Sequence, residues 1–497
     1  MKKLISALAL LLLVACGPSI PDDYTASRSL PDIYPDYIDV TIPVNIAPLT
    51  FEMENPSDEM VARYTIDDEQ LVCGGKAIQP DIDNWQRLLT KACGRNLKVE
   101  VFANYDGQWI GYKPFTIKVS PDSIDTWISY RLISPSYVSY EELTINQRCL
   151  ENYDERVIYD NMLCSLEGDG QCINCHNYQQ YNPKRMQFHA RQAHGGTIMV
   201  YDGKLQKIDM KNDSLLSAGV YPTWHPWLPL IVYSTNKTHQ SFHTMHRNKI
   251  EVFDSESDLI VYDVTKNEVT HIENDPTEFE VFPFWAPDGK SLYYCSAHFE
   301  FTDTVNPIVE VIRRGEELKY NIYKKSFDPE TMQFGPRQMV FDASTIDKSA
   351  TLPRISPDGR WLVFAIAPYG VFHIWHRDAD LWIMDLQTGT TRSFDEINSN
   401  ETESYHSWSS NGRWLTFSSR RYDGDYTRPF FAHVAKNGKA DKPFELPSAN
   451  PDYHRQFMKC YNIPEFMKGP VTIKPQEFAD ILKGEGVPVK YVQKLRK

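Results

Sequence analysis

The sequence is poor in basic residues for its length, and this limits the partners that it can bind. Its 497 residues contain 52 Lys and Arg against 66 Asp and Glu, which gives a formal net charge of −14. A protein that binds nucleic acid needs Lys and Arg to neutralise the phosphates. We therefore expect no nucleic-acid partner.

Several common catalytic motifs are also missing. The sequence contains no G-x-S-x-G, no H-E-x-x-H and no Walker loop. These patterns place a nucleophilic serine, a zinc ion with its general base, or a nucleotide phosphate. Hydrolase and nucleotide chemistry therefore lack their usual residues, and we expect electron transfer or binding rather than catalysis.

Long hydrophobic runs are absent after the first residues of the chain. The single long apolar run covers residues 4–13, follows Lys2 and Lys3, and is too short to cross a bilayer as a helix. A positive start followed by such a run is typical of a secretory signal peptide. We therefore expect the protein to be exported.

The run ends in L-V-A-C-G at residues 13–17. This resembles the lipobox of bacterial lipoproteins, whose cysteine is lipidated and becomes the first residue of the mature chain. The resemblance implies a lipid anchor on Cys16, with acyl chains rather than a helix holding the protein to the membrane. Because Gly17 follows the cysteine, it also implies the periplasmic side of the outer membrane, with exposure on the cell surface left open. An ordinary signal peptide with an incidental cysteine is the alternative.

The sequence contains one C-x-x-C-H motif, at Cys172, Cys175 and His176. This is the attachment sequence of a c-type haem, in which two thiols bond to the vinyl groups and the adjacent histidine binds the iron. A thioredoxin-type redox motif fits less well, because a Gly-Asp-Gly stretch and not a strand precedes it. A zinc ribbon needs a second C-x-x-C, which is missing. We expect one covalent haem c with His176 as the proximal ligand.

The second axial ligand of the iron has two main candidates, Met186 and His189. They are three residues apart, so on a helix both side chains lie on one face. We favour Met186 slightly, because an imidazole at position 189 can equally bind a haem propionate. His194 is a further candidate, although the adjacent Gly-Gly indicates a loop.

The rest of the chain reads as mainly β. Four short runs rich in β-branched and aromatic residues indicate a β-sandwich-like N-terminal domain; they cover residues 38–42, 97–102, 115–119 and 127–132. The predicted parts, in chain order, are a signal peptide (1–15), a tether (16–36), the β-sandwich-like domain (37–135), a short helical haem c-binding segment (136–194), a β-propeller (195–450) and a C-terminal extension (451–497).

The propeller is predicted from a repeat. Four segments share a proline or histidine, an aromatic or aliphatic residue and a turn, and each precedes a β run; they begin at Pro222, Pro283, Pro353 and His406. Asp-Gly or Asn-Gly steps in the last three indicate tight hairpins. The pattern resembles the TolB-type propeller repeat, in which each repeat is one sheet of a closed ring.

Lipobox, β domain, C-x-x-C-H and TolB-type repeats together resemble a group of Bacteroidetes-type TolB-like lipoproteins, often labelled cytochrome c biosynthesis proteins. The resemblance implies a role in the cell envelope. We expect electron transfer through one haem, with the propeller as a docking platform for a redox partner. The alternative is a non-enzymatic scaffold that binds an envelope protein or glycan, its haem structural or absent. A haem enzyme with an open axial position is a weaker option.

The remaining cysteines are not assigned by the motif. Cys73 and Cys93 fall in the N-terminal domain and are able to form a disulfide in an oxidising compartment. The sequence leaves the pairing of the other four open; they are Cys149, Cys164, Cys295 and Cys460.

Overall fold

The computed structural model describes residues 17–135, 142–165, 170–245, 248–302 and 305–496. The predicted signal peptide and Cys16 lie outside the described residues. Within them the protein is mainly β, as the sequence predicts. No helix in these ranges is long and apolar enough to span a membrane.

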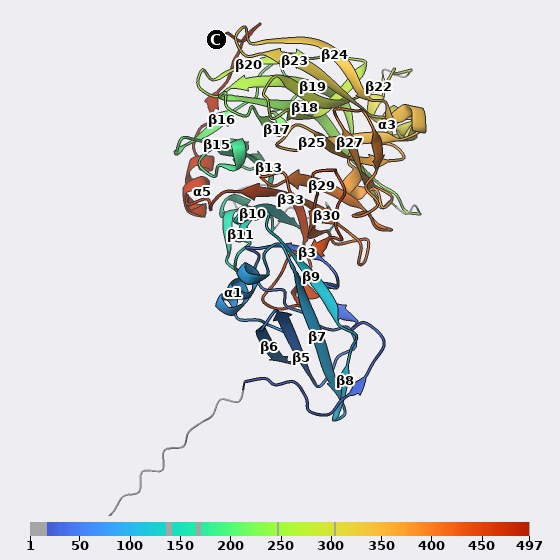
Figure 1. Ribbon diagram of the computed structural model, residues 1–497. Coiled ribbons are helices and arrows are strands. Elements are labelled where there is room, and N and C mark those ends of the chain that lie inside the picture. Colours follow the sequence, from blue (N-terminus) through green and yellow to red (C-terminus); the bar gives the residue numbers. More distant parts are fainter. Residues whose placement is uncertain (1–16, 136–141, 166–169, 246–247, 303–304, 497) are drawn as a thin grey trace, which may run out of the picture.

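A seven-stranded sheet with one helix forms the N-terminal end of the molecule (Figure 1). Its strands are β1 (Thr25–Ala26), β3 (Thr41–Pro43), β5 (Glu59–Ile66), β6 (Glu69–Gly75), β7 (Asn96–Tyr105), β8 (Gln108–Gly111) and β9 (Phe115–Ser120). Helix α1 (Ile82–Ala92) begins at Asp81, whose carboxylate accepts a hydrogen bond from the backbone N–H of Asn84 at 3.0 Å. The buried face of α1, which carries Trp85, packs on β5 and β6.

This arrangement corrects three predictions. The domain is one sheet covered by a helix and not two facing sheets. The predicted tether packs on it, because β1 pairs with β8, and β2 (Ile33–Tyr34) pairs with β4 (Glu52–Met53) and is buried. Cys73 and Cys93 are free thiols, since Cys73 faces the core and Cys93 faces solvent after α1.

The rest of the described chain contains six antiparallel four-stranded sheets. One strand of each, which we call its inner strand, contacts the inner strands of two other sheets, and the sheets are numbered in chain order of these strands. Sheets 1 to 3 are β13 (Gln171–Tyr178), β14 (Met186–Gln192), β15 (Gly196–Tyr201), β16 (Lys204–Asp209); β17 (Val220–Trp224), β18 (Leu230–Phe242), β19 (Ile250–Asp263), β20 (Glu268–Glu273); and β21 (Glu278–Trp285), β22 (Ser291–His298), β23 (Asn321–Asp328), β24 (Gln333–Phe341). Sheets 4 to 6 are β25 (Ser349–Ile355), β26 (Trp361–Ala367), β27 (Asp380–Asp385), β28 (Thr391–Ser393); β29 (Glu403–Trp408), β30 (Trp414–Ser419), β31 (Arg428–His433), β32 (Phe444–Glu445); and β33 (Cys460–Met467), β10 (Trp127–Ile133), β11 (Thr144–Cys149), β12 (Glu155–Asp160). One parallel bridge, between Ser257 and Phe279, joins sheets 2 and 3.

The first strand of each sheet is its inner strand, and the inner strands contact one another in sequence. Contacts run from β13 to β17, β21, β25, β29 and β33, and β33 contacts β13. The predicted hairpins follow the inner strands of sheets 2 to 5. Each closes with the same backbone hydrogen bond, 2.7–2.8 Å long, from His225 to Leu230, Ala286 to Ser291, Ser356 to Trp361 and Ser409 to Trp414.

Sheet 6 joins two distant parts of the chain. β10 pairs with β33, so that Trp127 lies opposite Met467 and Ile133 opposite Cys460 (Figure 1). The predicted boundaries at residues 135 and 450 therefore need correction, because β10 belongs with the C-terminal segment. Beyond β33, helix α5 (Pro475–Lys483) packs on β12 and β16, and β34 (Val487–Pro488) and β35 (Lys490–Tyr491) extend sheets 1 and 2.

The predicted helical segment at residues 136–194 is also incorrect. Strands β11, β12, β13 and β14 occupy most of its described part, which contains one short α-helix, α2 (Met162–Ser165), and one 3-10 turn at Gln179–Tyr181. Helix-like spacing and strand alternation coexist in this stretch, and pairing with neighbouring strands decides between them. Two other short helices, α3 (Pro307–Arg313) and α4 (Tyr453–Gln456), lie in connections between strands.

Candidate functional site

Each inner strand contains a bulge at the same position. Six non-glycine residues there have φ between 46° and 60°; they are Cys175, Tyr221, Phe282, Leu352, Tyr405 and Ile463. At each of them the pairing with the neighbouring strand shifts in register. A bulge bends its strand and redirects side chains. The repetition of this left-handed residue therefore brings six equivalent side chains to one place.

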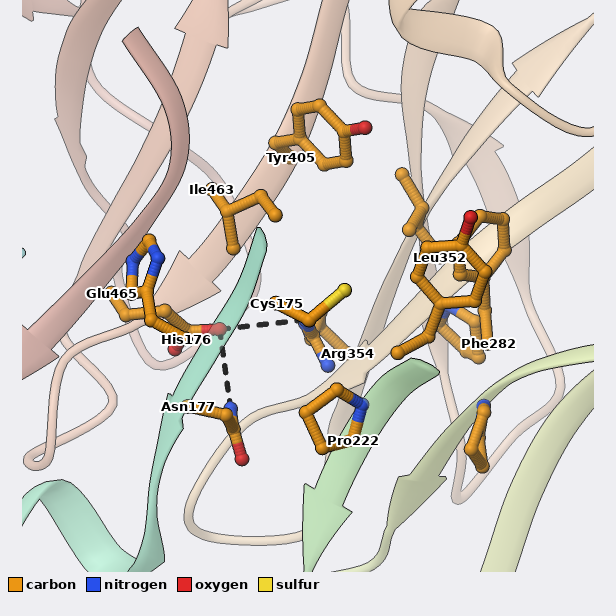
Figure 2. Close-up of a pocket in the computed structure, with 13 residues that line it drawn as sticks. Cys175, His176, Asn177, Pro222, Phe282, Leu352, Arg354, Tyr405, Ile463 and Glu465 are labelled. Carbon is orange, nitrogen blue, oxygen red and sulfur yellow. Dashed lines mark hydrogen bonds and ion pairs between the residues drawn. The ribbon is translucent and has the colours of Figure 1, made fainter. Parts of the chain in front are cut away.

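These six residues surround a small cavity between the inner strands (Figure 2). Its wall is largely apolar and aromatic, with a few polar groups, as in many small-molecule and cofactor sites. The other lining residues are His176, Asn177, Pro222, Pro283, Pro353, Arg354 and Glu465. Two of the three residues of the C-x-x-C-H motif, Cys175 and His176, therefore line this cavity.

The thiol of Cys175 points into the cavity, toward the side of Phe282 and Leu352 (Figure 2). The residue is 2% exposed, and burial raises the pKa of its thiol. A thiol with a raised pKa is protonated at neutral pH and is a poor spontaneous nucleophile. Chemistry at Cys175 therefore requires a partner that enters the cavity.

The imidazole of His176 is buried against the ring of Tyr178 and near the backbone of Ser129 and Ile463. The residue is 1% exposed, and neither ring nitrogen makes a hydrogen bond with a described residue. Burial, with a smaller contribution from Arg131, lowers the pKa of His176 to about 3. The ring is therefore neutral at pH 7, which is the form that binds a metal ion.

Cys172 lies three residues before Cys175 on β13. It is half-buried, packs against the core that contains Met186 and Phe188, and does not line the cavity. The inward thiol of Cys175 and the apolar wall suit a haem at this position, whereas Cys172 lies outside the cavity and the ring of His176 points away from the Cys175 thiol (Figure 2). The structure brings one of the two motif thiols, and the predicted proximal ligand, to the cavity wall.

The two candidates for the second axial ligand lie on β14 and not on a helix. Met186 is fully buried in the core beside Phe188, and the Nδ1 atom of His189 lies 3.2 Å from the hydroxyl of Thr197. Residues three apart on a strand face opposite sides, so the shared helical face is incorrect. Neither residue lines the cavity. The assignment of either to the iron stays a prediction.

A charged pair separates the cavity from a second, wider hollow. Glu465 accepts hydrogen bonds from Arg354 and Asn177, each at 3.5 Å, and all three residues line both spaces (Figure 2). Burial raises the pKa of the Glu465 carboxyl, and Arg354 opposes this shift. Arg354 and Glu465 therefore place two ionisable groups between the two spaces, next to the C-x-x-C-H motif.

The predicted repeat does not include two of the inner strands, β13 and β33, although their sequences match its pattern. Ile463, Pro464, Glu465 and Phe466 of β33 match the Tyr-Pro-Thr-Trp pattern of β17 in hydrophobicity and proline position. In β13, His176 takes the position of this proline. The C-x-x-C-H motif thus also overlaps the first copy of the repeat.

Among the described residues, no group of three or more His, Cys, Asp or Glu side chains is arranged to hold a metal ion. The candidate site consists of the cavity, Cys175 and His176 on its wall, and the Arg354–Glu465 pair between the cavity and the wider hollow.

Comparisons with known proteins give distant structural similarity only. No family model and no curated protein matches the chain. A puromycin-hydrolysing peptidase of Mycobacterium tuberculosis is 10% identical over 82% of this chain and 57% of its own, with a TM-score of 0.37. The hydrazine synthase of Kuenenia stuttgartiensis is 11% identical over 54% of this chain and 64% of its own, with a TM-score of 0.33. A DUF4784 family protein of Bacteroides caccae is 7% identical over 74% of this chain and 96% of its own, with a TM-score of 0.29. The chain thus spans little more than half the length of the first of these proteins.

Proposed function

We propose that the six sheets are the blades of a six-bladed, TolB-like β-propeller. The succession of contacts between inner strands, which returns from β33 to β13, supports this arrangement. So does the pairing of an early strand with a late one in sheet 6, since such pairing holds the two ends of a ring together.

We further propose that the propeller carries one covalent c-type haem, held through Cys172 and Cys175 with His176 as an iron ligand, and that it transfers electrons. The observation that carries this proposal is the position of Cys175 and His176 on the wall of the central cavity. A bound haem supplies a one-electron couple. The protein's own residues would bury it, exclude water through the apolar wall and present a neutral imidazole.

The test is covalent haem attachment. The full chain, expressed in the periplasm with c-type maturation machinery, should retain haem after denaturation. Changing Cys175→Ala should strongly reduce the retained haem, because it removes one of the two thioether bonds. The buried Cys164, which lies outside the motif, gives the matched control, and Cys164→Ala should leave haem retention unchanged.

Absence of retained haem under conditions that load a known c-type cytochrome would contradict the proposal. Equal haem retention in Cys175→Ala and the unchanged chain would contradict it as well. The predicted second ligand is tested on the same material. If neither Met186→Ala nor His189→Ala changes the optical spectrum of the reduced haem, that assignment is wrong.

The cellular setting remains part of the proposal. A lipid on Cys16 would anchor the protein at the outer membrane, where a redox partner in the envelope exchanges electrons with it one at a time. The alternative function, an envelope scaffold that binds a protein or glycan, is favoured by one observation. The hollow beyond Arg354 and Glu465 is larger than the cavity itself.

A further inference from the structure

The wider hollow, which we call the funnel, lies between the cavity and the hairpin turns. Its rim includes a residue from the turn after each of four inner strands; these are Pro226, Pro287, Pro357 and Ser410. Its floor is formed by Asn177, Arg354 and Glu465, which it shares with the cavity. The remaining wall is largely aromatic and includes Tyr178, Tyr181, Trp224, Phe284, Trp285 and Trp408.

The funnel is basic in a protein that is acidic overall. Arg354 and Lys468 line it. The adjoining hollow, which shares Gln180, Pro226 and Lys468 with the funnel, is lined also by Lys184 and by Arg185, whose guanidinium pairs with Asp202 at 2.6 Å. Glu465 is the one acidic residue among the described residues that line the two spaces. The chain as a whole carries 14 more acidic than basic groups. This reversal of sign favours an anionic occupant.

At the funnel floor, the guanidinium of Arg354 is positioned by an aromatic ring and makes few hydrogen bonds. Its guanidinium stacks over the ring of Phe284 at 5.0 Å and makes, within the described residues, one long hydrogen bond of 3.5 Å to Glu465. A guanidinium has five N–H donors and matches a carboxylate in bidentate geometry. Burial raises the pKa of the Glu465 carboxyl, and the adjacent Arg354 opposes this shift.

Lys468 provides a second cation at the same opening. Its ammonium lies 5.5 Å from the centre of the Tyr181 ring, and its charge opposes the burial that raises the pKa of Asp125, whose carboxylate is held by Ser410. Arg354 and Lys468 therefore lie on different elements of one aromatic-walled space. This combination suits a ligand with a charged end and a compact organic body.

We propose that the funnel binds a small organic carboxylate from solution, with Arg354 as the bidentate partner and Lys468 as the second cation. The proposal does not depend on haem attachment. The same chemistry has a second possible source, because the propionates of a haem in the adjacent cavity are also carboxylates.

Binding is tested first on full-length protein expressed without haem maturation. Succinate and galacturonate are titrated, with succinamide and galactose as neutral analogues, by calorimetry and by fluorescence of the tryptophans that line the funnel. At least one carboxylate should saturate the protein below about 10 mM. Arg354→Gln should weaken binding about tenfold or more, and Lys468→Gln about threefold, because each removes a charged contact. Arg392→Gln, on the outer strand β28, should leave binding unchanged.

Saturation by neither carboxylate, or equal binding of the neutral analogues, would overturn the proposal. Tighter binding of inorganic phosphate than of both carboxylates would overturn the assignment to carboxylates. If Arg354→Gln fails to fold by circular dichroism, an unchanged affinity in Lys468→Gln overturns it instead.

Haem-loaded protein separates the two sources. If it still binds succinate, the ligand comes from solution, as proposed. If it does not, and Arg354→Gln shifts the haem midpoint potential, the carboxylates are the propionates, and the solution ligand is wrong while the carboxylate site stands. Failure of haem attachment leaves the first titration intact, so the two proposals fail separately.

Discussion

At the scale of single residues, Glu280 shows how burial among like charges changes a carboxyl group. It is 1% exposed on β21, and its Oε2 atom has no partner among the described residues. Burial is the main cause of its raised pKa, with repulsion from Asp258, Glu273 and Glu278 adding to it, and the pKa reaches about 9. The folded protein therefore holds a neutral carboxyl group there at pH 7. Several cationic or titratable side chains pair with the surrounding carboxylates, namely His271, His298, Lys325 and Arg337.

A raised pKa favours folding at low pH and opposes it at high pH. The contribution of Glu280 is complete below the ordinary value of 4.5 and declines as the pH rises toward 9. Glu280→Gln keeps the shape of the neutral form and does not ionise. Its free energy of unfolding should exceed that of the unchanged protein by a margin that grows by up to about 1.4 kcal/mol per pH unit between pH 5 and 8.

Urea unfolding of both proteins at pH 5, 6.5 and 8 measures this margin. The exposed Glu59, at the start of β5, gives the control, and the margin of Glu280→Gln is read against that of Glu59→Gln at each pH. A margin for Glu280→Gln that is the same at pH 5 and pH 8 would contradict the shifted titration.

At the scale of elements, the hairpin between β25 and β26 depends on a left-handed glycine. Gly359 has φ +74°, and a Cβ atom added there would meet nothing within 4 Å. The cost of Gly359→Ala therefore comes from the backbone alone, and we expect the free energy of unfolding to fall by about 1–2 kcal/mol. Gly315→Ala is the matched control, because its Cβ also has open space and its φ lies outside the left-handed range.

The measurement is the urea midpoint of each variant at unchanged slope. Equal loss of stability in Gly359→Ala and Gly315→Ala would show that the turn conformation is not the cause.

Local sequence signals predicted the hairpins and the strands beside them, because these signals act within a few residues. The Asp-Gly step before Arg360 and the β-branched and aromatic runs around it are sufficient for β25 and β26. The wrong helix at Met186 shows the limit of such signals. Met186 and His189 have helical spacing, but Met186, Phe188 and Ala190 also alternate as a buried strand face, and pairing with β13 and β15 decides the outcome.

Partners distant in sequence were beyond prediction for a similar reason. β10 and β33 are separated by more than 300 residues, and the sequence of neither strand identifies the other as its partner. Likewise, the residue types of the C-x-x-C-H motif and their spacing are enough to predict its chemistry. Its place at the bulge of an inner strand, beside Arg354 and Glu465, depends on six segments that meet only in the folded chain.

At the scale of the whole molecule, the proposed lipid anchor makes a simple prediction about location. The full-length protein, expressed in a host that processes lipoproteins, should sediment with membranes. Cys16→Ala should move it to the soluble fraction, because the acyl chains supply the attachment and not a spanning helix. Cys93→Ala is the control and should stay with the membranes. Membrane association that Cys16→Ala leaves unchanged would contradict lipidation at this residue.

The N-terminal sheet and the six-sheet part share one hydrophobic core. Tyr37, Val40 and Ile42 from the N-terminal part belong to the same cluster of buried residues as Trp414 of sheet 5 and Phe466 of sheet 6. The indole N–H of Trp414 donates to the backbone oxygen of Asp122 at 3.0 Å. A continuous core of this kind joins two parts into one cooperative unit.

We therefore expect the full chain to unfold in a single calorimetric transition. Trp414 is fully buried, so Trp414→Phe removes apolar contact and the hydrogen bond to Asp122 and should lower the free energy of unfolding by about 2 kcal/mol. The transition should move to lower temperature as a whole, because the tryptophan stabilises both parts together. Trp227, which is 52% exposed, is the control, and Trp227→Phe should have little effect. Two resolved transitions, or a shift of only one of them in Trp414→Phe, would mean that the N-terminal sheet folds independently of the six-sheet part.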